Sequence, residues 1–374
     1  MTSLSHMLKM SSDDDENTSL MQDQNLVQFR TGWLRYKNPK KWKFSLFNFF
    51  HIIINLWPYL KYFVFHKASK PNSAELNEHL PESAREPLEW LRNPPEKGIQ
   101  VLWIGHASLL VRIDGINILT DPVFYDCGPR IFGFRIFNYK RFRPPAVTVK
   151  DLKDENIQIH AVVISHDHFD HLDEQSVSEL VAYKADIEWY VPKNMSRWFK
   201  DRNCTNVTEL GWWEERTATG NLTVTCTPAK HWCGRNLRYY YCRHLWCSWY
   251  IVGPRGSKFF FAGDTGYAQG LYPSIKNKYG SPDLAAIPIG ACKPRPVMQA
   301  QHINPEEALI VHRELDAKNS IAIHWGMFAL SNEKINEPIE DLKKAKRENG
   351  DGTFVTMKHG EVKRFETNEA DESS

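Results

Sequence analysis

Residues 161–173 read AVVISHDHFDHLD, and the interpretation of the whole chain starts from them. The first four residues are apolar and mostly β-branched, which predicts a short buried strand over 161–164. The polar residues that follow then leave the C-terminal end of that strand, where sheet proteins often place their chemistry. Three histidines and two aspartates within six residues compete for protons unless a cation organises them. We therefore interpret this stretch as a metal site.

The spacing inside the motif suggests two cations rather than one. His166 and His168 alternate along the chain and can converge on one ion, whereas Asp170 and His171 can reach a second ion close by. Two further carboxylates, those of Asp173 and Asp121, are candidates to orient the ligand imidazoles through their other N–H groups.

Composition bounds the class of protein. The chain has 374 residues, of which 42% are hydrophobic, enough for one large domain with appendages or two modest ones. Its 47 basic and 45 acidic residues leave a net charge of +2, so no overall field favours nucleic acid as a partner. The seven cysteines are odd in number and contain no C-x-x-C pair, which favours reduced thiols in a protein that faces the cytosol.

The first 97 residues are expected to differ from the rest. Residues 1–30 carry an acidic run and no periodic apolar pattern, so we expect disorder there and no signal peptide. Residues 31–97 are expected to form a basic and aromatic membrane-associating segment followed by a linker. Within it, residues 44–65 form an apolar run that polar residues interrupt, which favours a position in the membrane interface. Packing on its own domain or on a dimer partner, and a spanning anchor, are the alternatives.

Residues 98–366 are expected to form the main domain, followed by an acidic tail at 367–374. Strands and helices intersperse through both halves, which points to two sheets covered by outer helices. The strands are predicted near 100–104, 108–113, 117–119, 161–164, 187–191, 222–227, 247–252, 258–262, 284–287, 320–323 and 353–357. The helices are predicted near 174–183, 194–201, 305–315 and 336–348, the third beginning after Asn304 as N-cap with Pro305 at its first position.

A site for two ions needs ligands beyond the first motif, including an anionic one that can bridge them. Three predicted strand ends supply candidates. His231 follows the strand near 222–227, Asp264 follows an apolar strand and Gly263, and His324 ends the strand near 320–323. A single histidine at a strand end is more often structural, but together with the motif these three residues are expected to be ligands.

Taken in order, the HxHxDH motif, a later lone histidine, a Gly-Asp pair and a final histidine resemble the metallo-β-lactamase superfamily. The local sequence resembles in particular its N-acyl-phosphatidylethanolamine-hydrolysing phospholipase D family. That resemblance lies in His231-Trp232-Cys233, FFFAGDTGY (259–267), LAAIPIGA (284–291), Gln301-His302 ahead of Pro305, and AIHWGMFAL (322–330). It implies an α/β fold of the αββα sandwich type, with two mixed β-sheets flanked by helices.

The resemblance also implies the metal ligands. Two zinc ions per chain are implied, each on three residues of its own and sharing one aspartate. The first ion would be held by His166, His168 and His231, the second by Asp170, His171 and His324, and both by Asp264.

The same resemblance implies the reaction. A hydroxide bridging the two zinc ions would hydrolyse N-acyl-phosphatidylethanolamine to N-acylethanolamine and phosphatidic acid. Gln301 and His302 match the family's pair near the scissile phosphate, and His302 is a candidate to hydrogen-bond or protonate the leaving group.

A homodimer with a groove facing the membrane, and amphipathic effectors such as bile acids, are implied as well. We expect an intracellular protein held peripherally on the cytosolic face of endomembranes. One alternative is a hydrolase of the same superfamily that acts on a lactone, a thioester or an RNA phosphodiester. Another is a metal-stabilised membrane-binding scaffold without turnover, for which a missing ligand would be the sign, and none of the seven ligands is missing.

Overall fold

The computed structural model describes residues 71–81, 97–128, 139–235, 243–349 and 352–367, and the short strands at 26–28, 34–36, 130–131 and 134–135. The run 44–65, most of the N-terminus expected to be disordered, and the acidic tail beyond its first residue lie outside the described residues. Strand β1 (Leu26–Gln28) pairs with β2 (Leu34–Tyr36), so the end of that N-terminal segment is in part a strand. Within the described part of the chain, no helix combines the length and apolar character needed to cross a bilayer.

Two seven-stranded sheets form the centre of the molecule. The first sheet has the order β10-β9-β8-β5-β4-β3-β18 and the second has the order β11-β12-β13-β14-β15-β16-β17. The strands of the first sheet are β3 (Ile99–Gly105), β4 (Ser108–Ile113), β5 (Ile116–Thr120), β8 (Ala161–Val163), β9 (Glu188–Pro192), β10 (Val207–Leu210) and β18 (Val362–Phe365). The strands of the second sheet are β11 (Glu215–Thr217), β12 (Thr223–Thr227), β13 (Ser248–Val252), β14 (Lys258–Phe261), β15 (Leu284–Pro288), β16 (Ser320–Ile323) and β17 (Phe354–Val355).

Both sheets are mixed, as predicted. In the first sheet the pairs among β10, β9, β8 and β5 are parallel, and those among β5, β4, β3 and β18 are antiparallel. In the second sheet β11 to β14 pair antiparallel and β14 to β17 pair parallel. The two sheets therefore share the same mixture of strand directions, and the C-terminal strand β18 completes the first sheet.

Successive residues of a strand point to opposite faces of its sheet, and strand β3 shows how this builds two cores. Its Val101 and Trp103 belong to the core between the sheets, whereas Leu102 and Ile104 belong to a second core beneath the outer helices. Because both faces of the strand are covered, its sequence is almost continuously apolar.

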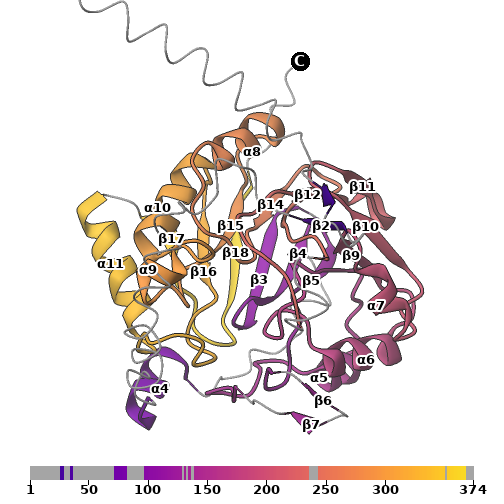
Figure 1. Ribbon diagram of the computed structural model, residues 1–374, viewed down its shortest axis with the longest axis horizontal. Coiled ribbons are helices and arrows are strands. Elements are labelled where there is room, and N and C mark those ends of the chain that lie inside the picture. The colour runs from indigo at the N-terminus through magenta and orange to yellow at the C-terminus, as the bar shows by residue number, and fades with distance from the viewer. Residues whose placement is uncertain are drawn as a thin grey trace, which may run out of the picture.

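Helices flank the two sheets (Figure 1). The helices over the first sheet are α5 (Val149–Asp154), α6 (Glu174–Tyr183) and α7 (Ser196–Lys200), whose apolar faces share a core with that sheet. Those over the second sheet are α8 (Leu271–Tyr279), α10 (Pro305–Glu314) and α11 (Glu337–Asn349), with the short α9 (Arg295–Met298) ahead of α10. The predicted αββα sandwich is confirmed.

Most predicted elements are present within a residue or two. The predicted helix over 174–183 and the predicted strands over 108–113 and 320–323 match α6, β4 and β16, and Asn304 caps α10 ahead of Pro305. The prediction missed the small pair β6 (Arg130–Ile131) and β7 (Phe134–Arg135), together with α5, α8, α9, β10, β11 and β18.

Helix α4 (Ser73–His79) ties the N-terminal part of the chain to the main domain. The fully buried Leu80, just after the helix, packs close to Gly326, so close that a Cβ added to Gly326 would lie 3.4 Å from a Leu80 methyl group. Arg143 donates its Nε–H to the carbonyl of Leu80 over 3.0 Å. Residues 71–81 thus reach the loop that follows strand β16.

Direct hydrogen bonds join the two sheets beside the HxHxDH motif. The indole N–H of Trp249 on β13 donates to the carbonyl of Ile164 over 3.0 Å, and the amide of Cys247 donates to the carbonyl of Ser165 over 2.9 Å. These bonds satisfy the backbone of the residues just after β8. They fix where the motif begins relative to the second sheet.

Candidate metal centre

All predicted metal ligands lie just beyond the C-terminal ends of strands. His166 to His171 follow β8, and the remaining three follow β12, β14 and β16. Strands β14, β15 and β16 are parallel, and β12 runs in the same direction because two antiparallel pairings separate it from β14. These carboxyl ends therefore share one edge of the second sheet and meet the motif of the first sheet there.

The first cluster contains His166, His168 and His231. Nε2 of His166 lies 2.8 Å from Nδ1 of His168, and Nε2 of His231 lies 3.2 Å from the same Nδ1 atom. Two of the rings are buried and that of His168 is half-buried. Three imidazole nitrogens thus converge on one position, as the sequence predicted.

The second cluster contains Asp170, His171 and His324. Oδ2 of Asp170 lies 3.4 Å from Nε2 of His171 and 3.4 Å from Nε2 of His324. The two Nε2 atoms lie 3.1 Å apart. These atoms also converge as predicted.

Asp264 stands between the two clusters. Its Oδ1 lies 3.0 Å from Nε2 of His324, and its Oδ2 lies 3.2 Å from Nε2 of His171. The same Oδ2 atom lies 3.8 Å from Nε2 of His166 and 3.7 Å from Nε2 of His231. One carboxylate therefore faces both sets of nitrogens, which is the arrangement required of a bridging ligand.

Gly263, ahead of Asp264, allows this close approach. It has φ +58°, and a Cβ on it would lie 2.6 Å from the Cβ of Ser165. Only glycine combines that conformation with that lack of space. The two strand ends can therefore meet.

A chain of hydrogen bonds sets the tautomers of two ligands. Nδ1–H of His166 donates to the hydroxyl of Ser165 over 2.8 Å, and that hydroxyl donates to Oδ2 of Asp121 over 2.6 Å. Nδ1–H of His171 donates to the same carboxylate oxygen over 2.7 Å. In their neutral form both imidazoles therefore carry a bare Nε2, the atom that binds a metal. Asp121 thus orients a ligand as the sequence suggested, whereas Asp173 caps helix α6 by accepting from the amide of Ser176 over 2.9 Å.

The loop that carries His231 is held by a residue of the motif that was not assigned a role. The carboxylate of Asp167 accepts from the amide of Gly234 over 2.7 Å and contacts Nδ1 of His244 at 2.9 Å. Its backbone carbonyl accepts from Nε of Arg235 over 2.6 Å. Asp167 faces away from the ions' positions and fastens the β12–β13 loop to the motif.

Gln301 and His302 both lie at the centre. The backbone carbonyl of Gln301 accepts from Nδ1–H of His231 over 2.9 Å, while its side-chain Oε1 accepts from the indole N–H of Trp232. Nδ1 of His302 lies 3.8 Å from Oδ2 of Asp264, and no described group hydrogen-bonds to it. The two residues therefore have different positions: Gln301 supports the proposed ligand His231 through its backbone carbonyl, and His302 faces the carboxylate of Asp264.

His106, in the turn between β3 and β4, is a site residue that the sequence interpretation missed. Its Nε2 lies 3.0 Å from Oδ2 of Asp170, and its ring lies 4.0 Å from that of His324. The signal in the sequence was a lone histidine after Gly105 at the end of an apolar strand.

The buried carboxylates of Asp264 and Asp170 need positive charge close to them. Burial would raise the pKa values of Asp264 and Asp170, but the imidazoles around them, that of His171 foremost, hold both pKa values well below their usual range. Burial would likewise lower the pKa of His324, yet Asp264 and Asp170 raise it to about 9. Without metal ions, protonated imidazoles must neutralise these buried carboxylates. Divalent cations satisfy the same demand and leave the nitrogens free to coordinate, so these residues fit metal ions.

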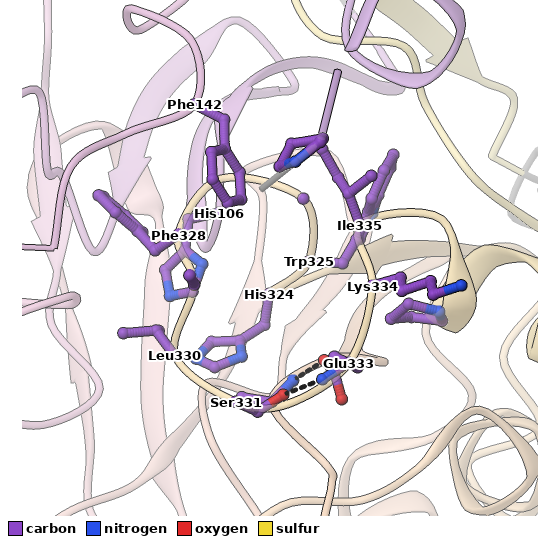
Figure 2. A pocket seen from close by; sticks show the side chains of 15 residues that line it. His106, Phe142, His324, Trp325, Phe328, Leu330, Ser331, Glu333, Lys334 and Ile335 are labelled. Carbon is purple, nitrogen blue, oxygen red and sulfur yellow. Dashed lines mark hydrogen bonds between the residues drawn. The ribbon is translucent and has the colours of Figure 1, made fainter. Parts of the chain in front are cut away.

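A small pocket with a partly apolar wall opens beside the second cluster. Its cavity volume is about 40 Å³, and it is partly open to solvent. Figure 2 shows His106 and His324 in its wall with Phe328, while Lys334 points away from them. Its apolar lining comes from Pro71, Phe142, Trp325, Phe328, Leu330, Ile335 and Pro338. The metal centre thus borders a small pocket whose wall is partly apolar.

Comparison with known proteins identifies the family of this centre. The family model described as "Beta-lactamase superfamily domain" matches residues 116–325 of this chain. The chain is 38% identical over 279 residues to N-acyl-phosphatidylethanolamine-hydrolyzing phospholipase D 1 of Caenorhabditis elegans, covering 71% of this chain and 76% of that protein. It is 35% identical over 245 residues to the mitochondrial N-acyl-phosphatidylethanolamine-hydrolyzing phospholipase D of Saccharomyces cerevisiae, covering 64% of this chain and 50% of that one.

Among solved structures, a possible metal-dependent hydrolase from Veillonella parvula superposes with a TM-score of 0.55 at 15% identity. The match covers 71% of this chain and 98% of that one, and it shows a shared fold. With the ligand geometry above, these similarities make the protein a metal-dependent hydrolase. The chain belongs to the beta-lactamase superfamily and, within it, to the family of N-acyl-phosphatidylethanolamine-hydrolysing phospholipases D.

Proposed function

We propose that the protein binds two zinc ions and hydrolyses N-acyl-phosphatidylethanolamine to N-acylethanolamine and phosphatidic acid. The observation that carries the proposal is that His324 belongs to the two-cluster centre and also lines the neighbouring pocket, whose wall is partly apolar. A phosphodiester that carries an apolar group would contact both features. The names of the relatives in worm and yeast support the same substrate.

His166, His168 and His231 would hold the first ion, and Asp170, His171 and His324 the second, with Asp264 on both. When bound, two such ions lower the pKa of a water molecule and neutralise the oxygens of the phosphoryl group during displacement. The Ser165–Asp121 hydrogen-bond chain keeps Nε2 of His166 and His171 available for this purpose.

In this proposal His302 would contact the leaving group. Burial lowers its pKa to about 4, so its imidazole is neutral near pH 7. A neutral imidazole with an unpartnered ring nitrogen can hydrogen-bond the departing oxygen of the N-acylethanolamine. We assign His302 this role. Gln301 acts by supporting His231 and Trp232.

The decisive experiment is incubation of the purified protein with vesicles of N-acyl-phosphatidylethanolamine. We expect release of N-acylethanolamine and phosphatidic acid, and near-complete loss of release in Asp264→Asn and His324→Ala. His160→Gln, a substitution outside the centre, serves as the matched control and should be active. Full activity in either ligand variant would overturn the assigned roles. Equal or faster turnover of a lactone, a thioester or RNA would point to the rival hydrolase class.

Metal analysis tests the cofactor independently of the substrate. Two zinc ions per chain are expected for the wild-type protein, and one or none would contradict the two-ion centre. A protein that binds two ions but releases no product from any of these substrates would favour the scaffold alternative.

The proposal includes peripheral contact with the cytosolic face of an intracellular membrane through the basic and aromatic segment within residues 31–97. Replacing Lys40, Lys41 and Lys43 by Gln in the full chain should weaken sedimentation with anionic vesicles. Replacing the exposed Lys150, Lys153 and Lys200 removes the same charge from the main domain and should leave sedimentation unchanged. Equal binding of both variants would move the membrane contact elsewhere. A homodimer and a bile-acid-like effector stay part of the proposal, tested by sedimentation equilibrium and by adding the amphiphile to the assay.

A further inference from the structure

We propose that His106 is a positioning residue that fixes two ligands of the second ion, holding Asp170 through its side chain and His324 through its backbone. The inference rests on the proposed two-ion centre and adds a residue to it. It explains why a histidine occupies a turn whose geometry favours glycine.

The side chain of His106 fixes the carboxylate of Asp170. Its Nε2–H donates to Oδ2 of Asp170 over 3.0 Å. That oxygen is the one that lies 3.4 Å from Nε2 of both His171 and His324, so it faces the position of the second ion. A single hydrogen bond from a buried ring therefore sets the orientation of a ligand oxygen.

The backbone of His106 fixes His324. Its carbonyl accepts from the amide of His324 over 3.1 Å and from the indole N–H of Trp103 over 3.0 Å. The ring of His106 also packs against Phe328, with the ring centres 5.2 Å apart. The turn between β3 and β4 of the first sheet is thereby fastened to the end of β16 in the second sheet.

The conformation of the turn shows that the imidazole is kept against a local preference. His106 has φ +58°, in the left-handed region that glycine adopts most readily. A residue other than glycine is held in that region when the surrounding structure over-determines it. For His106 these surroundings include the contact of its ring with Asp170 and the hydrogen bond of its carbonyl with His324.

The arrangement argues for a hydrogen-bond donor rather than an additional ligand. The proposed position of the second ion already has four candidate protein ligands, which are Asp170, His171, His324 and Asp264. Catalytic zinc sites keep a coordination position open for water or substrate. A fifth protein ligand would fill that position, whereas an N–H donated to Asp170 leaves it open.

The test measures zinc affinity by competition with a chelator, in full-length wild-type protein and three variants. His106→Gly removes the imidazole and suits the turn, and His106→Gln retains an N–H donor near the original Nε2. His359→Gln removes another buried imidazole next to β3, one that contacts the carbonyl of Ile104 and no proposed ligand. Circular dichroism melting confirms that each variant is folded.

We expect His106→Gly to lower the affinity for one of the two zinc ions by 10- to 100-fold and to leave the affinity for the other unchanged. His106→Gln should recover most of the loss, and His359→Gln should bind both ions as the wild type does. Unchanged affinity for both ions in His106→Gly would overturn the positioning role while leaving the proposed function intact. Equal weakening in His106→Gln and His106→Gly would overturn the donor role. Fewer than two ions on the wild-type protein would instead defeat the proposed centre itself.

Discussion

Oδ2 of Asp121 lies 2.7 Å from Nδ1 of His171, and both side chains are completely buried. The same carboxylate accepts from the amide of Ser165 over 2.7 Å through its other oxygen. Asp121, which is not a proposed ligand, therefore determines which ring nitrogen of the proposed ligand His171 carries the proton.

Replacing Asp121 by Asn should weaken the second metal site. The amide NH₂ would donate to Nδ1 of His171 and so move the imidazole proton to Nε2, the atom that must coordinate. We expect zinc affinity at that site to fall by 10- to 100-fold, measured by chelator competition. Asp114→Asn is the matched control, because Asp114 is also buried and accepts from the amides of Gly98 and Ser257, neither of which is a proposed ligand. Equal zinc affinity in the wild type and Asp121→Asn would contradict the tautomer argument.

Gln301 should act on catalysis through Trp232 and not through the metal. Gln301→Ala keeps the backbone carbonyl that holds His231, so we expect two zinc ions to remain bound. The variant loses the acceptor for the indole N–H of Trp232, as does Trp232→Phe from the other side. The effects of the two substitutions on kcat/KM should therefore be less than additive in the double variant. Strict additivity would show that the Gln301 side chain acts separately.

Trp249→Phe should destabilise the contact between the sheets. The substitution keeps most of the apolar bulk but leaves the buried carbonyl of Ile164 without its indole donor. An unsatisfied buried group costs about 1–3 kcal/mol, so the free energy of unfolding in urea should fall by about that amount. Trp198→Phe, a half-buried residue on α7, should change it by less than about 0.5 kcal/mol. Similar losses in the two variants would indicate that ring size, and not the hydrogen bond, matters.

His359 should make the protein less stable in acid. Burial lowers its pKa to about 4 in the folded protein, from an ordinary value of 6.5 in the unfolded chain. The unfolded chain therefore binds the extra proton between these values, and stability falls as the pH drops from about 6.5 to about 4. The contribution is at most about 3 kcal/mol. Urea unfolding of the wild type and His359→Gln at pH 7.5 and 4.5 should show a smaller acid loss in the variant, and equal losses would refute the assignment.

Most of the candidate site could be assembled from the sequence because the proposed ligands follow strongly apolar strands. Ala161–Val163 and Ser320–Ile323 are recognisable as strands; the polar motif begins at Ser165, one residue beyond the first, and His324 directly follows the second. Asp264 is recognisable for the same reason, through Lys258–Phe261 and Gly263. Candidate metal ligands at the end of a buried strand can therefore be recognised from the local sequence.

His106 and Asp167 were missed because their roles depend on distant parts of the chain. His106 acts through a left-handed turn and through Asp170, and neither a backbone angle nor a partner 64 positions away is visible in the letters around it. Asp167 lies inside the motif and was overlooked because its partners, Gly234 and His244, belong to another loop.

The missed elements have similar explanations. Val362–Phe365 becomes a strand by pairing with β3 at the opposite end of the domain. Leu271–Tyr279 contains Pro273 in its first turn and a polar second half, so its helical pattern is weak until Leu271, Tyr272 and Ile275 pack on the second sheet. Tertiary contacts override local preference in both cases.

The division of the ligands between the two sheets bears on how the protein is made. Each proposed ion takes two side chains from the loop after β8 and two from the second half of the chain, with Asp264 counted for both. A chain emerging from the ribosome exposes the HxHxDH loop long before His324 has been synthesised. An unfinished chain therefore carries only half of the proposed ligands of each cation. We infer that the metal ions bind late in biosynthesis, after both sheets have assembled.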